Sequence, residues 1–448
     1  MDETLMCDGS DVYDYSSIAA FRYPRLANSI RRIGKKITQI VCSDNHAIIK
    51  LTDGTLLACG ENAYGQLGLE DTHKRSRFVE INGIKNAEQI ICGIDYTIIR
   101  LANGTLMSCG RNYGQLGHGD CLDRNRFEEI PLIPKNIAEV LNGDYHLIIR
   151  LTDGTLMSCG SNGYGQLALG DIWNSTLFQE IKIPKNIAEV KCASNRTIIR
   201  LTNGILVGCG ENRFGQLGLG DILNRNRFER IGGVPHNVAE IILGSEHTII
   251  RLMDGTLMGC GNNQFGQLGL GDNLPRTSFR EIKGIPKNIL KVITTLHTII
   301  VLTNGTLLGC GSNRYGQLGL GDYSDRHLFE EIKQIPKNIP LAEVICDNGY
   351  TVIRLIDGTL MCCGWNEYNE RNSYRRQSFF KEIPRTEDSI KVLRRLFGLF
   401  LKLGWWYYCL RLLLENKVII KLITAAAAPI LKRKYVSGEI ASHLQVSG

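Results

Sequence analysis

Cysteine followed by glycine recurs along this chain about once every 50 residues. The seven copies are Cys59, Cys109, Cys159, Cys209, Cys260, Cys310 and Cys363. Thiols bind zinc or form disulfides, but zinc needs four ligands within ~2.0–2.3 Å of one point, and a disulfide needs Cα atoms about 4.4–6.8 Å apart. One cysteine per repeat suits neither geometry. We therefore expect small buried packing residues, no metal site and no cofactor.

A second recurring position stands thirteen residues before each Cys-Gly pair. It holds His46, Tyr96, His146, Arg196, His247, His297 and Tyr350. Imidazoles serve as general bases or metal ligands, but the chain has no recognisable set of nucleophile, base and orienting group, no HExxH and no phosphate-binding loop. The sequence therefore predicts a protein that is not an enzyme. The histidines form either a polar ring available for recognition or hydrogen bonds to a loop of their own repeat.

Aspartate and arginine stand four residues apart in five of the repeats. The pairs are Asp71 and Arg75, Asp120 and Arg124, Asp221 and Arg225, Asp272 and Arg276, and Asp322 and Arg326. A ring of arginines could bind an anion, but a local ion pair explains both residues. Such exposed pairs contribute only ~0–1 kcal/mol each, so we interpret them as loop-pinning contacts.

Each repeat contains four short apolar runs that must position these residues. In the repeat around Cys159 the runs span 137–143, 146–151, 155–160 and 177–181. Four short strands joined by tight turns make one blade of a β-propeller, and a period near 50 residues is typical of such arrays. The pattern leaves no clear place for a helix in 36–384.

The turn between the second and third runs is the most regular signal. It reads Asp53-Gly54, Asn103-Gly104, Asp153-Gly154, Asn203-Gly204, Asp254-Gly255, Asn304-Gly305 and Asp357-Gly358. Asp-Gly and Asn-Gly suit a type I′ turn, in which both central residues have positive φ. We therefore predict a two-residue β-hairpin in every repeat.

A glycine-rich loop, such as "GENRFGQLGLGD" at 210–221, follows the third run. We expect its recurring glutamine to hydrogen-bond backbone groups within the loop or in the next blade. Together with "LTDGTLMSCGSNGYGQL" at 151–167, this pattern resembles the regulator of chromosome condensation repeat family over 36–384. The resemblance implies an all-β fold, a seven-bladed β-propeller of four-stranded blades.

The ends of the chain depart from the repeat. The seventh repeat, "CGWNEYNERNSYRRQSFF", lacks the Gly-Gln-Leu-Gly segment, and terminal repeats are often atypical. We predict three parts: an N-terminal segment at 1–35 that covers the ring seam, the propeller at 36–386, and a short helical, hydrophobic and basic C-terminal tail at 387–448.

Function is expected on the loops just before the second strands, because their sequences vary while the scaffold stays constant. The predicted partner-binding residues are Asp44, His46, Asp95, Asp144, His146, Glu246, His247 and His297. We interpret the protein as a non-enzymatic protein–protein interaction scaffold. In the family's nuclear member, such a face engages a Ran-type small GTPase and drives nucleotide release with acidic loop residues. The resemblance therefore implies the alternative of a guanine-nucleotide exchange factor.

Charge separates the propeller from the tail. Eleven Lys and Arg and four Asp and Glu follow Pro384, so the whole net charge of +7 lies there. A neutral body disfavours nucleic-acid binding, which needs a concentrated cationic surface. The segment 394–434 is apolar, aromatic and basic; it packs on the propeller, lies on a membrane surface or spans a membrane. The acidic N-terminus has no secretory signal, and we expect an intracellular monomer in the cytoplasm or nucleus.

Overall fold

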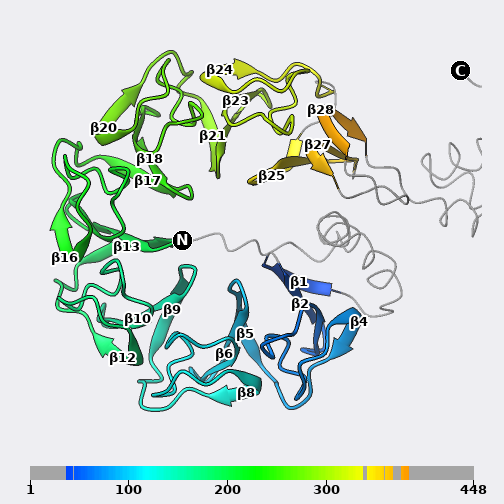
Figure 1. Cartoon of the computed structure of the whole chain (residues 1–448), viewed down its shortest axis with the longest axis vertical. Helices are drawn as coiled ribbons and strands as arrows, with labels where there is room; N and C mark the ends of the chain where they lie inside the picture. The colour runs from blue at the N-terminus through cyan, green and yellow to red at the C-terminus, as the bar shows by residue number, and fades with distance from the viewer. Residues whose placement is uncertain (1–36, 44, 337–340, 358, 367–374, 383–448) are drawn as a thin grey trace, which may run out of the picture. The chain divides into compact units, whose positions relative to one another are not determined.

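The computed structural model describes residues 37–43, 45–336, 341–357, 359–366 and 375–382. They form seven four-stranded antiparallel sheets, each built from consecutive strands. Figure 1 shows these blades following one another around an axis. The predicted seven-bladed β-propeller is thus confirmed. Within these ranges no helix is long and apolar enough to cross a bilayer.

The strands occupy equivalent places in every blade, and blades are numbered one to seven along the chain. The first strands, nearest the axis in Figure 1, are β1 (Ile37–Cys42), β5 (Ala87–Cys92), β9 (Ile137–Asn142), β13 (Ile187–Ala193), β17 (Val238–Leu243), β21 (Ile289–Thr294) and β25 (Leu341–Asp347). The second strands are β2 (His46–Leu51), β6 (Tyr96–Leu101), β10 (His146–Leu151), β14 (Arg196–Leu201), β18 (His247–Leu252), β22 (His297–Leu302) and β26 (Tyr350–Leu355). The third strands are β3 (Leu56–Gly60), β7 (Leu106–Gly110), β11 (Leu156–Gly160), β15 (Leu206–Gly210), β19 (Leu257–Gly261), β23 (Leu307–Gly311) and β27 (Leu360–Asn366). The outer strands are β4 (Arg75–Glu80), β8 (Arg124–Glu129), β12 (Ser175–Glu180), β16 (Arg225–Arg230), β20 (Arg276–Ile282), β24 (Arg326–Glu331) and β28 (Arg375–Glu382).

Strand positions agree closely with the apolar runs. The run at 146–151 is β10, and the run predicted at 177–181 begins two residues earlier, at Ser175. The propeller belongs to the first of two compact units of the chain, Met1–Lys381. The predictions for 1–35 and for the helical tail at 387–448 lie outside the described residues.

The hairpin turn differs from the prediction. Lys50 pairs with Leu56, and the Leu51 N–H bonds the Thr55 carbonyl at 2.9 Å, which leaves a three-residue loop. Gly54 has a φ of +83°, whereas Asp53 is not left-handed, so the type I′ turn is wrong. The loop is instead a turn closed by a left-handed glycine. The Asp53 carboxylate accepts the Thr55 N–H at 3.0 Å, which explains why every turn has Asp or Asn before its glycine.

The hydrophobic core lies between neighbouring blades. Ile98 and Leu106 of blade two form one buried cluster with Val140 and Ile149 of blade three. The second strands have almost no exposed residue on either face, as in "HLIIRL" of β10. Stability therefore comes from a series of blade-to-blade interfaces, each burying apolar side chains.

The recurring cysteine belongs to these interfaces. Cys159 is fully buried, and its Sγ lies 3.6 Å from the Gln115 carbonyl of the preceding blade. Burial raises the pKa of the Cys159 thiol well above its usual range, so the thiol stays protonated and unreactive. The glycine after it, Gly160, has a φ of +110°, and a Cβ there would meet the Tyr145 carbonyl oxygen at 2.5 Å. The prediction of a small packing residue is confirmed at this position.

Candidate functional site

Two sets of loops share one end of the propeller, which we call the loop face. They connect first to second strands and third to fourth strands. The Asp-Gly and Asn-Gly turns lie at the opposite end, the turn face, because neighbouring strands are antiparallel. The predicted partner-binding residues that the structure describes belong to the loops before the second strands or are the first residue of those strands.

The structure corrects the placement of the four predicted histidines. Their side chains are fully buried rather than exposed on the loop face: His46, His146, His247 and His297. The second interpretation expected bonds to their own loop, but the Nε2 atom of each histidine instead reaches a threonine hydroxyl of the next blade. The reason is that both faces of a second strand pack against neighbouring blades, so its first residue points into an interface. Whether this face binds a partner stays a prediction.

The hydrogen bonds of His46 fix its proton. Its Nε2 lies 2.8 Å from the Thr97 hydroxyl, which donates to the Gln66 carbonyl at 2.7 Å. Because that carbonyl can only accept, the imidazole Nε2–H must donate to Thr97. Its Nδ1 then accepts from the Ser43 hydroxyl at 2.8 Å. Burial lowers the pKa of His46 to about 3, so this imidazole is neutral and acts as a connector between blades one and two.

The same position joins blades even where it is not histidine. The Tyr96 hydroxyl donates to the Gly143 carbonyl of blade three at 3.1 Å. Arg196 is buried and donates to the Gly244 and His247 carbonyls of blade five at 2.6 and 2.7 Å. Burial lowers the pKa of Arg196 to about 10, which leaves it charged at neutral pH. The recurring position thus serves blade-to-blade cohesion.

The predicted acidic residues are distributed over the loop face. Asp95 accepts from Asn45 at 3.2 Å and faces the Arg111 guanidinium at 3.4 Å. Glu246 in blade five accepts from Arg213 at 2.7 Å. Asp144 is half-buried and lines a depression of about 330 Å³ near the ends of the first strands of blades one to four. Asp44 lies outside the described residues.

An aromatic cluster on the loop face was not predicted from the sequence. The Arg111 guanidinium lies over the Tyr64 ring at 4.4 Å and over the Tyr113 ring at 4.7 Å. Tyr145 packs edge-on against Tyr113, with ring centroids 5.2 Å apart. We call Tyr64, Asp95, Arg111, Tyr113 and Tyr145 the Tyr–Arg cluster. The signal was the aromatic residue before the glycine in each glycine-rich loop.

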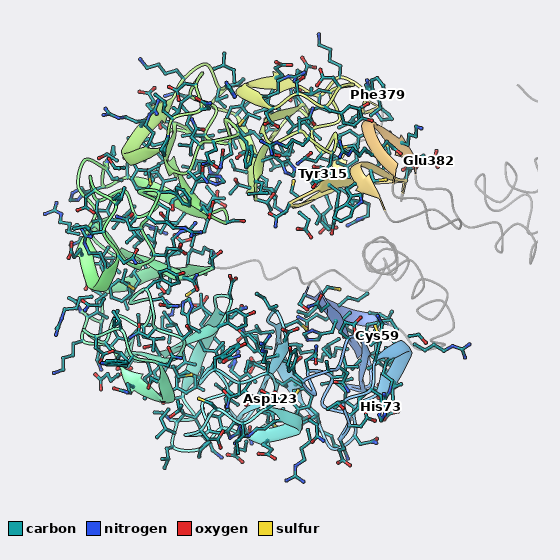
Figure 2. All side chains as sticks on the ribbon, viewed as in Figure 1. Cys59, His73, Asp123, Tyr315, Phe379 and Glu382 are labelled. Carbon is teal, nitrogen blue, oxygen red and sulfur yellow. The ribbon has the colours of Figure 1, made fainter. Side chains whose placement is uncertain are left out.

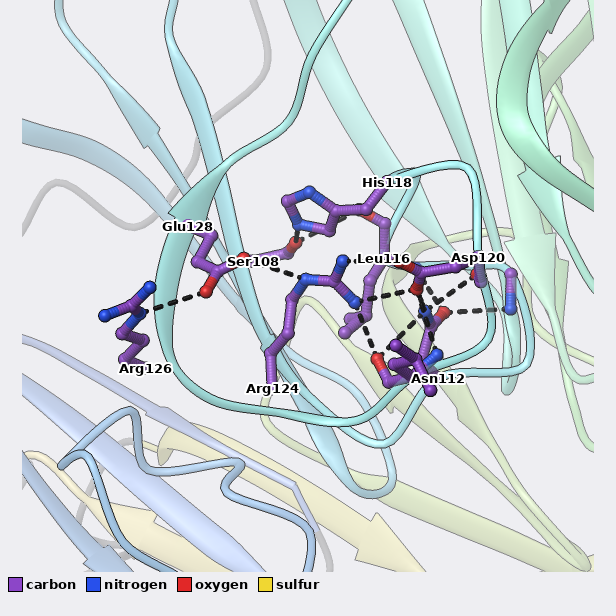
Figure 3. Close-up of polar contacts among 10 residues, drawn as sticks. Ser108, Asn112, Leu116, His118, Asp120, Arg124, Arg126 and Glu128 are labelled. Atoms are coloured by element: carbon purple, nitrogen blue, oxygen red, sulfur yellow. Dashed lines mark hydrogen bonds and ion pairs between the residues drawn. The ribbon is translucent and has the colours of Figure 1, made fainter.

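Figure 3 shows how the glycine-rich loop of blade two is held. The Asn112 amide donates to the Asp120 carbonyl at 2.9 Å. Arg124 binds both carboxylate oxygens of Asp120 at 2.9 Å, and this contact lowers the pKa of Asp120 to about 2. The predicted local ion pair is confirmed here, and it rigidifies the loop rather than offering a free cation.

Within the described ranges, no three His, Cys, Asp or Glu residues are grouped so as to hold a metal ion. The loop face presents partly exposed aromatic and charged side chains, which are of the types enriched at protein interfaces.

A model of a known protein family matches this chain over more than half of its length. The family model described as the RCC1-like domain matches residues 19–293. The chain belongs to this family. A model of the regulator of chromosome condensation (RCC1) repeat also matches residues 296–317. No curated protein sequence is significantly similar to the chain.

Three solved structures are similar to this chain in fold. Prp20p from Saccharomyces cerevisiae, described with its binding properties to Gsp1p and histones, is 20% identical, with a TM-score of 0.59 over 71% of this chain and 82% of that one. Yeast RCC1 (Prp20) bound to Kap60 is 19% identical, with a TM-score of 0.58 over 69% and 78%. Human WBSCR16 is 19% identical, with a TM-score of 0.57 over 70% and 86%. At these identities the likeness establishes the shared fold.

Proposed function

We propose that this RCC1-like propeller is a non-enzymatic protein–protein interaction scaffold that binds its partner through the loop face. The Tyr–Arg cluster carries the proposal. Tyrosine and arginine dominate the binding energy of protein interfaces, and here both are already ordered before a partner arrives.

Pre-ordering is visible in the contacts of Arg111. Two tyrosine rings and the Asp95 carboxylate hold its guanidinium, while Arg111 and Tyr113 keep about a third of their surface exposed. A partner that covers them loses little side-chain entropy on binding. The ion pair also offers both a donor and an acceptor edge, which favours a partner with polar groups around an apolar centre.

The proposal is tested by affinity capture with the full chain and with the double variant Arg111→Ala, Tyr113→Ala. We expect a protein partner that the wild-type chain retains and the double variant loses. The control is Leu132→Ser, an exposed residue of the loop that connects blades two and three at the turn face. A partner retained equally by all three chains would overturn the assignment to the loop face.

A second candidate is guanine-nucleotide exchange on a Ran-type small GTPase. It is favoured by the likeness to Prp20p, whose structure is described together with binding to Gsp1p, and by the acidic Asp95, Asp144 and Glu246 of the loop face. The full-length protein should then accelerate release of labelled GDP from such a GTPase. No acceleration across a panel of small GTPases would remove this candidate and leave the scaffold.

The proposal also includes the cellular location of the protein, its oligomeric state and its contact with a membrane. We propose that the protein acts inside the cell, in the cytoplasm or nucleus, and as a monomer; light scattering of the purified chain and imaging of a tagged copy test these statements. Contact of 394–434 with a membrane also remains a proposal, which a chain lacking that segment would test.

A further inference from the structure

The loops before the outer strands repeat one turn in six blades. An aspartate Oδ1 accepts the backbone N–H of the residue two positions later, at 2.9–3.0 Å. We call that later residue the tip. The six tips are His73, Leu122, Trp173, Leu223, Leu274 and Ser324. Figure 2 labels His73 of blade one, and Asp123 next to the tip of blade two.

The tips of blades two to five are large, apolar and exposed. The exposed fractions are 69% for Leu122, 76% for Trp173, 65% for Leu223 and 59% for Leu274. Ile172 and Ile222, just before two of the tips, are also more than half exposed. Such an accumulation of exposed apolar side chains marks an interaction site.

Comparison among the blades shows that the fold does not require these side chains. His73 and Ser324 make the same turn with polar side chains. An aspartate–arginine ion pair lies next to the tip both in blade one, whose tip is polar, and in blade four, whose tip is apolar. The turn therefore does not require an apolar tip residue. We infer that the apolar side chains of blades two to five are there because of what they contact outside the protein.

Repetition also determines how the tips are arranged. Each tip occupies the same place in its blade, so the four apolar tips lie along an arc in one plane at the loop face. They do not merge into one continuous patch. Arg227 of blade four lies against the Gly170 loop that leads to Trp173, and Ser278 of blade five lies against the Gly220 loop that leads to Leu223, whereas the apolar Leu177 of blade three adjoins the Gly119 loop that leads to Leu122. A protein interface needs a contiguous, closely packed apolar core. Separate apolar points in one plane instead suit a fluid, planar surface.

We propose that the apolar tips of blades two to five insert into the surface of a lipid bilayer. Leucine, isoleucine and tryptophan side chains are those that interfacial proteins bury at the boundary between headgroups and acyl chains. The aspartates beneath the tips of blades two, four and five are paired with arginines, and Asp171 of blade three has Ser175 in place of the arginine, so these pairs give the arc no excess of positive charge. Binding is thus expected on uncharged phosphatidylcholine and is insensitive to salt. The tips share no residue with the Tyr–Arg cluster.

The test is cosedimentation of the full-length chain with phosphatidylcholine vesicles and with vesicles containing phosphatidylserine, at low and high salt. The variant replaces Leu122, Trp173, Leu223 and Leu274 with serine, the residue that makes this turn in blade six. The matched control replaces Leu132, Met253 and Ile356, exposed apolar residues of the turn face, with serine. Urea unfolding of each protein establishes that the fold is kept.

We expect the wild type and the control to bind phosphatidylcholine vesicles equally, and the tip variant to bind at least tenfold more weakly. Three results would overturn the proposal. The wild type could fail to bind phosphatidylcholine, or bind only the anionic vesicles, as the basic tail would do by itself. The tip variant could bind like the wild type. Finally, the wild type could dimerise without lipid while the tip variant is monomeric, which would make the tips a contact between two copies of the chain.

Discussion

Acidification should destabilise the propeller well before its carboxylates titrate. Burial lowers the pKa of His46 and His247 to about 3 and that of His146 and His297 to about 4. An unfolded histidine titrates near 6.5. The unfolded chain therefore binds more protons, and stability that is full above pH 6.5 falls as the pH drops toward the native values.

The magnitude follows from linkage. At about pH 5 the unfolded histidine is mostly protonated and the native one is neutral. This difference lowers the free energy of unfolding by ~2 kcal/mol per histidine. The four buried histidines together lower the free energy of unfolding by ~8 kcal/mol, which is comparable to the entire stability of a typical domain. The carboxylates contribute little in this window, because Asp120 is ionised down to about pH 2 in the fold and an unfolded aspartate titrates near 3.9.

Urea unfolding at pH 7.5 and at pH 5, followed by tryptophan fluorescence, measures the effect. His46→Gln keeps an amide N–H for the Thr97 hydroxyl and removes the titrating group, so its loss of stability on acidification should be ~2 kcal/mol smaller than that of the wild type. His73→Gln is the control, since that side chain is 83% exposed. An equal pH dependence in the wild type and His46→Gln would refute the placement of this imidazole in a dry interface.

Two further predictions concern the blade interfaces. Thr97→Val leaves the His46 Nε2–H and the Gln66 carbonyl without their shared partner and should cost ~1–3 kcal/mol in urea unfolding; a change no larger than that of the exposed Thr52→Val would contradict it. Iodoacetamide should label the exposed Cys121 in the native protein, whereas Cys159 should react only after unfolding. Peptide mass spectrometry distinguishes them, and native labelling of Cys159 would show that the interface opens.

Much of the fold was predictable because each blade repeats the same short-range signals. The apolar run at 146–151 and the Asp153-Gly154 turn are features of short sequence segments. The positions of strands can be predicted from such segments without knowing which blades pack together. The type I′ turn was wrong because Asp-Gly also suits a three-residue loop with a left-handed glycine, and the two differ only in strand register.

The site was less predictable because its contacts cross between blades. His46 opens a strand whose two faces are both buried, so the usual alternation of buried and exposed residues gave no sign of its burial. Tyr64 and Arg111 meet although they lie in different repeats. Near-identical repeats reveal the scaffold but hide which of their variable residues come together.

Binding of the partner through the Tyr–Arg cluster of the loop face can be measured directly. The measurement is the dissociation constant of the captured partner for the wild type, Arg111→Ala and Leu132→Ser. Truncation of an interface residue that dominates binding costs at least ~2 kcal/mol, or about 30-fold in affinity. We predict that loss for Arg111→Ala and an unchanged constant for Leu132→Ser. Wild-type affinity in Arg111→Ala, or a loss confined to Leu132→Ser, would show that the Tyr–Arg cluster does not bind the partner.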